Sequence, residues 1–439
     1  MNITWRIFFF LQLLDCSFSG VQAQVEKIPL PSSGKLPSFH LTATPTFAIR
    51  NFVDCNMASA WIGDSFRIFP GKYGEDPLWG NARDLKYASG TTIDEVYLSE
   101  PAVYKEPQMP QNMSPGSEGL HGAVWFETLY QDSSDLSGRH LFALYHNENY
   151  PSTLPYNPKT GEGYIDRNWP EGLRGPATKT AVCRIGIMES NDGGIRWTDR
   201  GILLQDLQPR LILRPHNTGI NFAGGVGDPS AIASGPWLFI FFGEYGYPGR
   251  YEERTYDSLK EWKGQCISVA RVRLSDLRHP VWKAKRWNGQ SFDAGSEDAG
   301  KPISPLQISR KDGGGAASSP WSKYYWGPSV SWNEYLQCWV MLMAKAEGPS
   351  WKGNSIYISY NLHIDLSSGN NALDWSKPEL ILQKPGHILW YPSLQPTNSE
   401  QDRKARYSSV RLGKRVRLFY KDITPDKGDY ISEYLLEFD

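Results

Sequence analysis

Residues 225–243, GVGDPSAIASGPWLFIFFG, contain two strand-like segments that meet at a turn. The first segment starts at Gly227 and ends at the turn Gly235-Pro236. The second segment, WLFIFFG, is continuously apolar. A short apolar run bounded by glycine and proline is typical of a buried strand and is too short for a helix. The stretch therefore predicts a hairpin of two strands.

The same hairpin pattern recurs five times along the chain. Each copy has a strand-like stretch, then an apolar segment that ends at a polar or glycine residue, and further strand-like segments follow. The copies are spaced irregularly, by roughly 65 to 100 residues. The apolar segments are SFRIFPG (65–71), HLFALYHNENY (140–150), WLFIFFGEYG (237–246), WVMLMAKAEG (339–348) and RVRLFYKD (415–422). Five units of about four strands predict an all-β fold, a five-bladed β-propeller.

The ends of the chain indicate how this domain is bounded. Arg6 precedes an apolar run, Ile7 to Leu14, and small residues follow at Val21 and Ala23. This order is typical of a secretory signal peptide, which we place at residues 1–23, and it predicts a secreted or periplasmic protein. We expect an N-terminal extension at 24–43 and one propeller domain at 44–439, with a closing strand supplied by TPTFAIRNF (44–52).

Composition restricts the partners. The formal net charge of −1 gives no electrostatic footprint for nucleic acid. No later segment has the roughly 20 apolar residues of a membrane-spanning helix. The 17 tryptophans suit both a large β core and sugar-stacking surfaces. Four cysteines remain after the signal, and their even number permits disulfides without specifying a pairing. The oligomeric state stays open.

Propeller geometry predicts which residues meet at the mouth of the channel. The innermost strand of each blade starts at the mouth and the second strand returns to it, so the starts of first strands and the ends of second strands share one face. First-strand starts place three acids there, and these are our catalytic candidates: Asp54, Glu127 and Asp228. Asp64 falls in a hairpin turn at the opposite face.

A second set of residues is predicted to line the same mouth and to contact a substrate. Its members lie at the ends of second strands or in the first strands and their entries. They are His146, Asn147, Glu148, Glu244, Trp326, Ser329, Trp390 and Tyr391. Trp326, Trp390 and Tyr391 offer rings for sugar stacking, although core packing is an equally simple role for aromatic residues in strands.

Carboxylates that converge from different strands are the groups that glycoside hydrolysis requires. One must be protonated to donate to the leaving oxygen, and another must be ionised to activate water or attack carbon. Crowding several acids raises the pKa of at least one of them. The sequence thus predicts a glycoside hydrolase acting on a polysaccharide or oligosaccharide, with no required cofactor and with a structural calcium ion left open.

The stretch 225–243 also resembles the Asp-Pro first-strand motif of five-bladed propeller glycosidases, glycoside hydrolase family 43 and its relatives. The set DCN, WFE, YHNE, GDPS, WGPSVSWN and WYPSL is similar to a group of secreted bacterial propellers without an assigned substrate. The family resemblance implies a base for Asp54, an acid for Glu127 and a pKa-setting carboxylate for Asp228. In family 43 the motif opens the first blade and here the third, so these roles are open to permutation.

One stretch points to another family. SNDGGIRW (190–197) fits the Asp-box pattern S-x-D-x-G-x-x-W of sialidases, which repeat it across several blades, whereas this chain has one intact copy. We expect Asp192 to accept backbone N–H groups in a tight turn, with Trp197 packed between blades. A sialidase, a polysaccharide lyase with His146 as base, and a non-catalytic glycan-binding propeller remain the alternatives.

Overall fold

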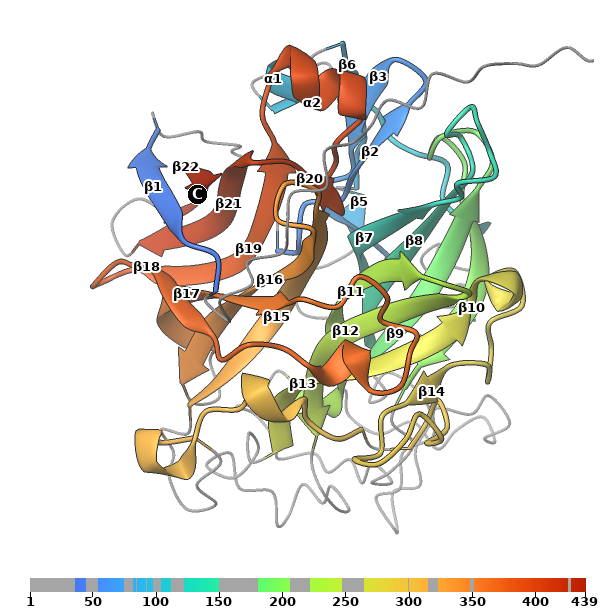
Figure 1. The fold of residues 1–439 in the computed structure, drawn as a ribbon. Helices are drawn as coiled ribbons and strands as arrows, with labels where there is room; N and C mark the ends of the chain where they lie inside the picture. The colour runs from blue at the N-terminus through green and yellow to red at the C-terminus, as the bar shows by residue number, and fades with distance from the viewer. Residues whose placement is uncertain are drawn as a thin grey trace, which may run out of the picture. The chain divides into compact units, whose positions relative to one another are not determined.

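Antiparallel sheets built from consecutive strands are the repeating unit of the fold (Figure 1). The computed structural model describes residues 36–44, 54–74, 82–83, 85–91, 93–97, 104–111, 122–149, 181–205, 222–246, 264–298, 300–314, 323–347, 351–424 and 428–439. The expected signal peptide, residues 1–23, lies outside these ranges.

The described strands group into five units in chain order, which we call the first to fifth sheets. Parallel pairing of β9 with β11 joins the second and third of them into one hydrogen-bonded sheet. The first sheet is β2 (Ser59–Ile62), β3 (Ser65–Ile68) and β6 (Ala88–Gly90). The second is β7 (Ala123–Gln131), β8 (Leu141–Asn149), β9 (Ala181–Ser190) and β10 (Thr198–Leu204). The third is β11 (Phe222–Ser234), β12 (Trp237–Gly246), β13 (Gly264–Arg273) and β14 (Lys285–Arg286). The fourth is β15 (Lys323–Asn333), β16 (Cys338–Glu347), β17 (Lys352–Asn361) and β18 (Glu379–Gln383).

The fifth sheet joins the two ends of the domain. It contains β19 (Ile388–Pro396), β21 (Arg415–Thr424), β22 (Gly428–Phe438) and β1 (Phe39–Ala43). β1 pairs with β22 in antiparallel register, from Phe39 opposite Phe438 to Ala43 opposite Tyr434. The closing strand therefore comes from the segment expected to be an extension, directly before Thr44. Most of the stretch expected to close the sheet, 45–52, is outside the described residues.

Shorter elements connect these sheets. β4 (Lys72–Gly74) and β5 (Ala82–Arg83) extend the second sheet beside β7, and β20 (Arg411–Leu412) pairs with β15. Within the described residues, the α-helices are α1 (Ile93–Tyr97) and α2 (Glu400–Ala405), both short. The 3₁₀ helices are η5 (Leu274–Asp276), η6 (Ser304–Leu306), η7 (Arg310–Asp312) and η9 (Asn371–Leu373).

The core lies between neighbouring sheets and explains the apolar runs. In β12, Phe239 and Phe241 pack toward the fourth sheet, whereas Leu238 and Ile240 pack toward the second. Because successive side chains of a strand point to opposite faces, a strand buried on both faces is continuously apolar. Each fully buried side chain of this size contributes about 1.5–3 kcal/mol.

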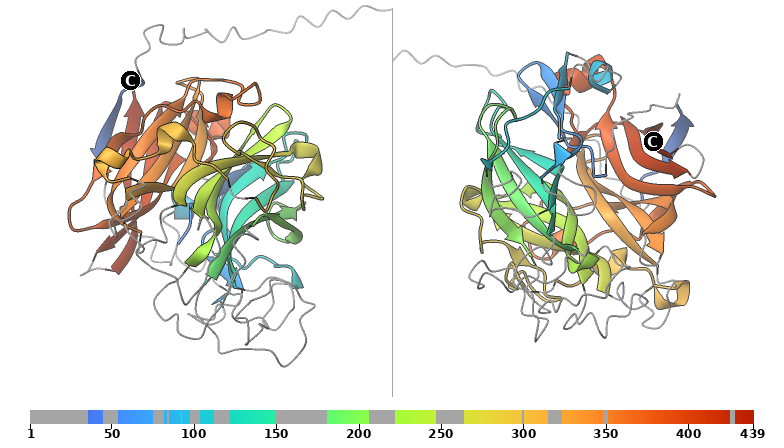
Figure 2. Two further views of the ribbon diagram at one scale, coloured as in Figure 1. Left: turned by 90° about the horizontal axis from the view of Figure 1, so that it is seen from below. Right: turned by 180° about the vertical axis from the view of Figure 1, so that it is seen from behind.

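Such layers close a ring of five sheets (Figure 2). Each innermost strand contacts the next one, from β2 through β7, β11 and β15 to β19. Ser59 of β2 donates to Oε1 of Gln395 in β19 at 3.0 Å, which links the last innermost strand to the first. The predicted all-β, five-bladed β-propeller is confirmed.

The stretch 190–197 forms the turn between β9 and β10. Asp192 Oδ1 accepts the N–H groups of Ile195 (3.1 Å) and Arg196 (2.9 Å), as predicted. Gly193 and Gly194 have φ of 78° and 88°, a conformation that glycine adopts without steric cost. Trp197 packs between Phe69 of the first unit and Phe126 of the second. The turn thus stabilises the junction of two blades.

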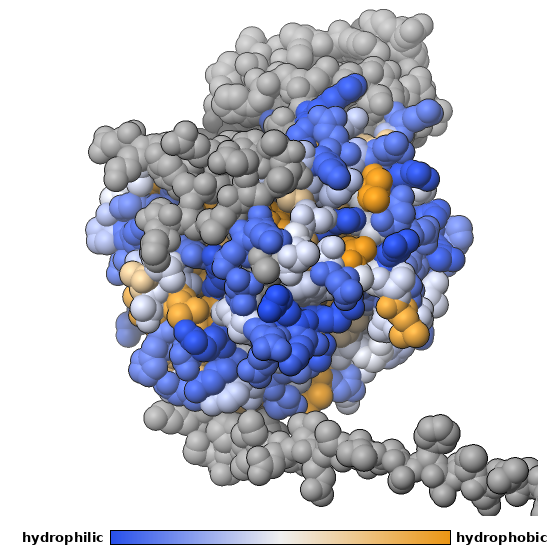
Figure 3. Space-filling model, turned by 90° about the horizontal axis from the view of Figure 1, so that it is seen from above, coloured by the Kyte–Doolittle hydropathy of each residue, from blue (hydrophilic) through white to orange (hydrophobic). Residues whose placement is uncertain are grey.

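The surface and the thiols add little to the functional assignment. Hydrophilic side chains predominate among the coloured residues of Figure 3, and apolar ones are scattered. Within the described ranges, no helix has the length and apolar character needed to cross a membrane. Cys55, Cys266 and Cys338 have free thiols, so none of these three is in a disulfide.

Candidate functional site

Bulges interrupt four of the innermost strands, β7, β11, β15 and β19. In β11, β15 and β19 the ladder is broken at an X-Pro-Ser sequence, where proline has no N–H to donate. The residue before each proline has a positive φ: 48° at Asp228, 58° at Gly327 and 48° at Tyr391. β7 has a similar irregularity at Glu127. The bulges release these four positions from the sheet ladder.

Two of these positions carry backbone strain. A left-handed conformation costs a residue other than glycine about 1–3 kcal/mol. Glycine avoids that cost in β15, but Asp228 and Tyr391 do not. Such strain persists where the surrounding structure holds the residue in place, and it is concentrated at functional sites. The strain therefore marks Asp228 and Tyr391 as candidates for a functional role.

Three buried side chains from two sheets form an acid cluster, comprising Glu127, His146 and Asp228. One oxygen or nitrogen atom from each lies within 4.8 Å of the others. His146 Nδ1 is 3.2 Å from Asp228 Oδ1, and the Tyr245 hydroxyl donates to Asp228 Oδ2. Glu127 and Asp228 are only 3% and 1% exposed. Two of the three predicted first-strand acids, Glu127 and Asp228, thus come together with His146.

Glu127 has an unusual electrostatic environment. Its Oε2 accepts the backbone N–H of Asn56 at 2.8 Å, whereas its Oε1 has no hydrogen-bond partner among the described residues. Burial raises the pKa of Glu127 well above its usual range, and the charges of Asp228 and Asp54 raise it further. The hydrogen bonds from Asn56 only partly oppose this. This carboxyl is therefore protonated over a wider pH range than an ordinary glutamate.

Two opposing effects act on the pKa of His146. Burial lowers the pKa of His146, but the hydrogen bond and charge of Asp228, together with the charges of Glu148 and Asp54, outweigh it and raise the pKa. The second strand of this sheet thus places a basic group beside two acids.

Asp54 is the most accessible of the three predicted acids. Its side chain is 25% exposed, and Lys421 Nζ lies 2.9 Å from its Oδ1. Lys421 is buried in β21, with its ammonium 5.3 Å from the centre of the Trp390 ring. Asp54 is close enough to raise the pKa values of Glu127 and Tyr391. It therefore stands at the edge of the acid cluster.

Aromatic side chains of the fourth and fifth sheets form one wall beside the acids. Trp326 contacts Trp390 and Tyr391 edge to face, with centroid separations of 5.8 and 5.2 Å. Trp390 Nε1 donates to the carbonyl of Trp351 at 2.8 Å. Burial and the charges of Asp228, Asp54 and Glu127 raise the pKa of Tyr391. Trp326 is buried, whereas Trp390 and Tyr391 are half-buried.

The other predicted substrate contacts have protein partners or face different surroundings. Asn147 is buried, and its Oδ1 accepts from Arg184 Nε at 3.0 Å. Glu244 pairs with Arg286 of β14 and accepts the N–H of Gly300 at 3.1 Å. Glu148 and Ser329 are half-buried.

Sequence reasoning missed three residues that complete the site. Lys421, Tyr245 and Asn56 bond to Asp54, Asp228 and Glu127 in that order. Lys421 had a signal, because lysine in a strand that is otherwise buried is rare unless it is paired. Tyr245 and Asn56 adjoin predicted positions, but nothing in their local sequence indicates a partner.

The donor atoms of the acid cluster also suit a cation. Calcium takes six to eight oxygen ligands, so two carboxylates and an imidazole fit it poorly. The same set suits a transition metal, for which imidazole is a common ligand.

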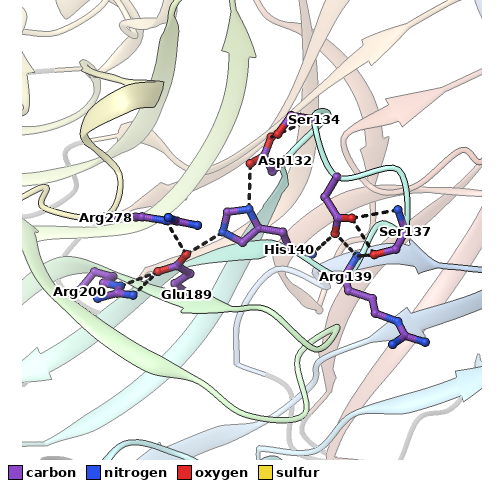
Figure 4. A network of polar contacts seen from close by, with 9 residues as sticks. Asp132, Ser134, Ser137, Arg139, His140, Glu189, Arg200 and Arg278 are labelled. Atoms are coloured by element: carbon purple, nitrogen blue, oxygen red, sulfur yellow. Dashed lines mark hydrogen bonds and ion pairs between the residues drawn. The ribbon is translucent and has the colours of Figure 1, made fainter.

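A separate polar network lies at the opposite end of the second sheet (Figure 4). Glu189, 1% exposed, accepts from His140 Nε2 at 2.7 Å, Arg200 Nε at 2.7 Å and Arg278 Nε at 3.0 Å. His140 Nδ1 lies 2.8 Å from Asp132 Oδ2. These hydrogen bonds and positive charges lower the pKa of Glu189 although burial alone would raise it.

Comparison with known proteins gives similar structures at low sequence identity. An exo-1,5-α-L-arabinanase from a bovine ruminal metagenomic library is 12% identical, with a TM-score of 0.41 over 91% of this chain and 95% of that one. An α-L-arabinofuranosidase from Podospora anserina, in complex with cellotriose, is 8% identical, with a TM-score of 0.45 over 92% and 98%. An N-acetylgalactosamine deacetylase from F. plautii is 10% identical, with a TM-score of 0.42 over 91% and 95%. No family model and no curated protein sequence matches the chain.

Proposed function

We propose that the protein is a glycoside hydrolase whose reaction takes place at the acid cluster and Asp54. The observation that carries the proposal is Glu127, a buried carboxyl with a raised pKa and an oxygen, Oε1, without a partner among the described residues. An unsatisfied buried polar atom costs about 1–3 kcal/mol, which a hydrogen bond from a bound substrate would offset. A substrate oxygen would supply the missing partner.

The three carboxyls are suited to different roles. Glu127 is the general acid, because its raised pKa keeps a proton available for the leaving oxygen as the glycosidic C–O bond breaks. Asp54 is the base that takes a proton from the attacking water, because it is the most exposed of the three and is ion-paired with Lys421. Asp228 sets the electrostatic environment: its charge raises the pKa of Glu127.

The aromatic wall supports a carbohydrate substrate. Trp390 and Tyr391 are half-buried beside the carboxyls, where a sugar ring could stack against an indole or phenol face. Tyr391 adopts a left-handed backbone conformation at this position.

We also propose that the protein is exported, on the basis of the order of Arg6, the apolar run and the small residues Val21 and Ala23. Sequencing the N-terminus of the exported protein tests this.

A broad glycan panel with the purified protein tests the activity. We expect release of reducing sugar from at least one glycan, loss of that release in Asp54→Asn, and full release with Lys404→Gln, a surface control on α2. Proton NMR of the first product anomer then gives the stereochemical outcome. Binding of a glycan without cleavage would favour a non-catalytic glycan-binding propeller, and full activity of Asp54→Asn would remove Asp54 from the reaction.

A metal-assisted hydrolase is the second candidate, favoured by the close approach of Glu127, His146 and Asp228 donor atoms. A bound transition metal would polarise a substrate oxygen or water, and these three side chains would hold it. The two candidates differ in metal content. The first predicts activity that survives exhaustive chelation, and the second predicts a stoichiometric metal that is lost in His146→Ala together with activity.

A further inference from the structure

A cavity of about 800 Å³ lies beside the fourth sheet, and none of its lining residues belongs to the acid cluster. Cavities of about 300–1,000 Å³ are the usual size of ligand sites. Its walls come from η6, η7 and the strand that follows them, from β16 and β17, and from the segment before β18. The lining residues are Ser304, Pro305, Gln307, Ile308, Ser309, Asp312, Tyr325, Lys345, Tyr357, Trp375, Lys377 and Pro378.

Aromatic rings form the base of this cavity. Tyr325 and Tyr357 are half-buried and meet edge to face, with centroids 5.0 Å apart at 62°. Trp375 is part of the core: its Nε1 donates to the Ala372 carbonyl, and its ring packs on Phe241. Two tyrosine rings with hydroxyls therefore remain to contact a ligand with apolar faces and polar edges.

One cation in the cavity, Lys345, makes no close ion pair with a described residue. Its side chain makes no hydrogen bond with a described residue either, and its Nζ lies 5.9 Å from the centre of the Tyr357 ring. Burial and the charge of Lys323 lower the pKa of Lys345, and the charges of Glu347 and Asp312 oppose this only in part. Lys323 is itself paired with Glu347 at 3.3 Å. A half-buried ammonium in this position favours an anionic ligand.

Two other charged residues, Asp312 and Lys377, line the cavity. Asp312, the acidic residue of the lining, accepts from the Ser309 hydroxyl at 2.5 Å. Lys377 is exposed and adds a second positive charge. The lining therefore combines two lysines, one carboxylate with a local donor, two tyrosines and the polar side chains of Ser304 and Gln307. Hydroxyls, ring faces and a negative charge in one ligand would satisfy this combination.

We propose that this cavity binds an acidic oligosaccharide, with the carboxylate of a hexuronic acid residue at Lys345 and its ring against Tyr325 and Tyr357. The site is separate from the acid cluster and does not depend on hydrolysis there. A charged glycan bound here would stay on the protein whether the glycosidic bond that is cleaved lies in that glycan or in another one.

Calorimetric titration with a galacturonic acid trimer and with its methyl ester tests the proposal. The ester keeps the sugar rings and removes the charge. We expect the free acid to bind, the ester to bind at least about tenfold more weakly, and Lys345→Gln to weaken binding of the acid by a similar factor. Lys404→Gln and Glu127→Gln should bind like the unmodified protein. Tyr357→Phe, which retains the ring, should weaken binding less than Lys345→Gln.

The proposal would be overturned by no binding of the acid, by equal binding of acid and ester, or by equal binding by Lys345→Gln and the unmodified protein. If Glu127→Gln alone abolished binding, the trimer would occupy the acid cluster, and this inference would fail while the proposed hydrolase would stand. A glycan panel without any cleavage would refute the hydrolase and leave the titration unaffected.

Discussion

Glu127 and Glu189 are both buried glutamates of the second sheet, but they differ in their hydrogen-bond partners and in the direction of their pKa shifts. Glu189 is held by His140, Arg200 and Arg278, and its pKa is lowered. Glu127 receives the N–H groups of Asn56, faces two other carboxyls and has a raised pKa. Burial disfavours the charged form in both cases, so the partners decide the direction. A fully paired carboxylate stabilises the fold, whereas an underpaired one retains a proton for chemistry.

The largest expected effect concerns catalysis and separates the two glutamates. Glu127→Gln keeps the size of the side chain but cannot donate a proton, so kcat should fall by about 10²- to 10⁴-fold. Glu189→Gln should leave kcat of the folded protein unchanged. Both values are measured on the glycan that the panel identifies. Equal kcat for Glu127→Gln and the unmodified protein would contradict the acid role.

The free energy of unfolding should respond in the reverse order, with a larger loss in Glu189→Gln than in Glu127→Gln. Glu189→Gln leaves Arg200 and Arg278 without their common carboxylate, and we expect a loss of about 2 kcal/mol in the free energy of unfolding. The figure is lower than for a fully buried pair because Arg278 is 59% exposed. Urea unfolding measures it. Glu437→Gln, which breaks exposed pairs with Lys414 and Arg415, is the matched control and should change stability little.

The pH dependence of stability should reveal the raised pKa of Glu127. Because its pKa is higher in the fold than in the unfolded chain, its contribution is fully present below about pH 4 and is lost as the pH rises toward its folded pKa. The stability of the unmodified protein should therefore fall relative to Glu127→Gln, by at most about 1.4 kcal/mol per pH unit. Parallel thermal unfolding curves at all pH values would show that Glu127 titrates normally.

The smallest effect concerns the bulges that carry the site. Gly327 has a φ of 58°, and a Cβ there would meet no atom within 4 Å, so Gly327→Ala should cost about 1 kcal/mol through the backbone alone. Gly327→Asn should cost less, because asparagine tolerates the left-handed region. Urea unfolding of both variants checks the order. Equal stability of all three proteins would mean that the bulge imposes no conformational demand.

Much of this fold could be predicted because the relevant signals are local. Apolar runs bounded by glycine and proline indicated the strands, and the hairpin turns indicated which strand ends share a face. The closing strand escaped prediction, since β1 is short, half-exposed and paired with residues about 400 positions away. Local sequence carries no information about such a partner.

The site was predictable to the extent that it depends on strand ends. Glu127, His146 and Asp228 converge because bulges and strand direction bring these three positions together. Glu244 occupies a comparable strand end but turns to Arg286, a partner that only the three-dimensional structure shows. Lys421 reaches Asp54 across 367 positions of sequence. Pairings of this kind decide which acid is neutralised and which is left for chemistry.

Infrared difference spectroscopy of the buried carboxyls tests the contrast most directly. A protonated carboxyl has a C=O stretch distinct from the bands of a carboxylate. Above the pH at which ordinary glutamates ionise, the unmodified protein should still show this band, Glu127→Gln should lose it, and Glu189→Gln should retain it. A spectrum without the band, or a band that persists in Glu127→Gln, would show that Glu127 is not the proton-holding group and would contradict its role as the acid.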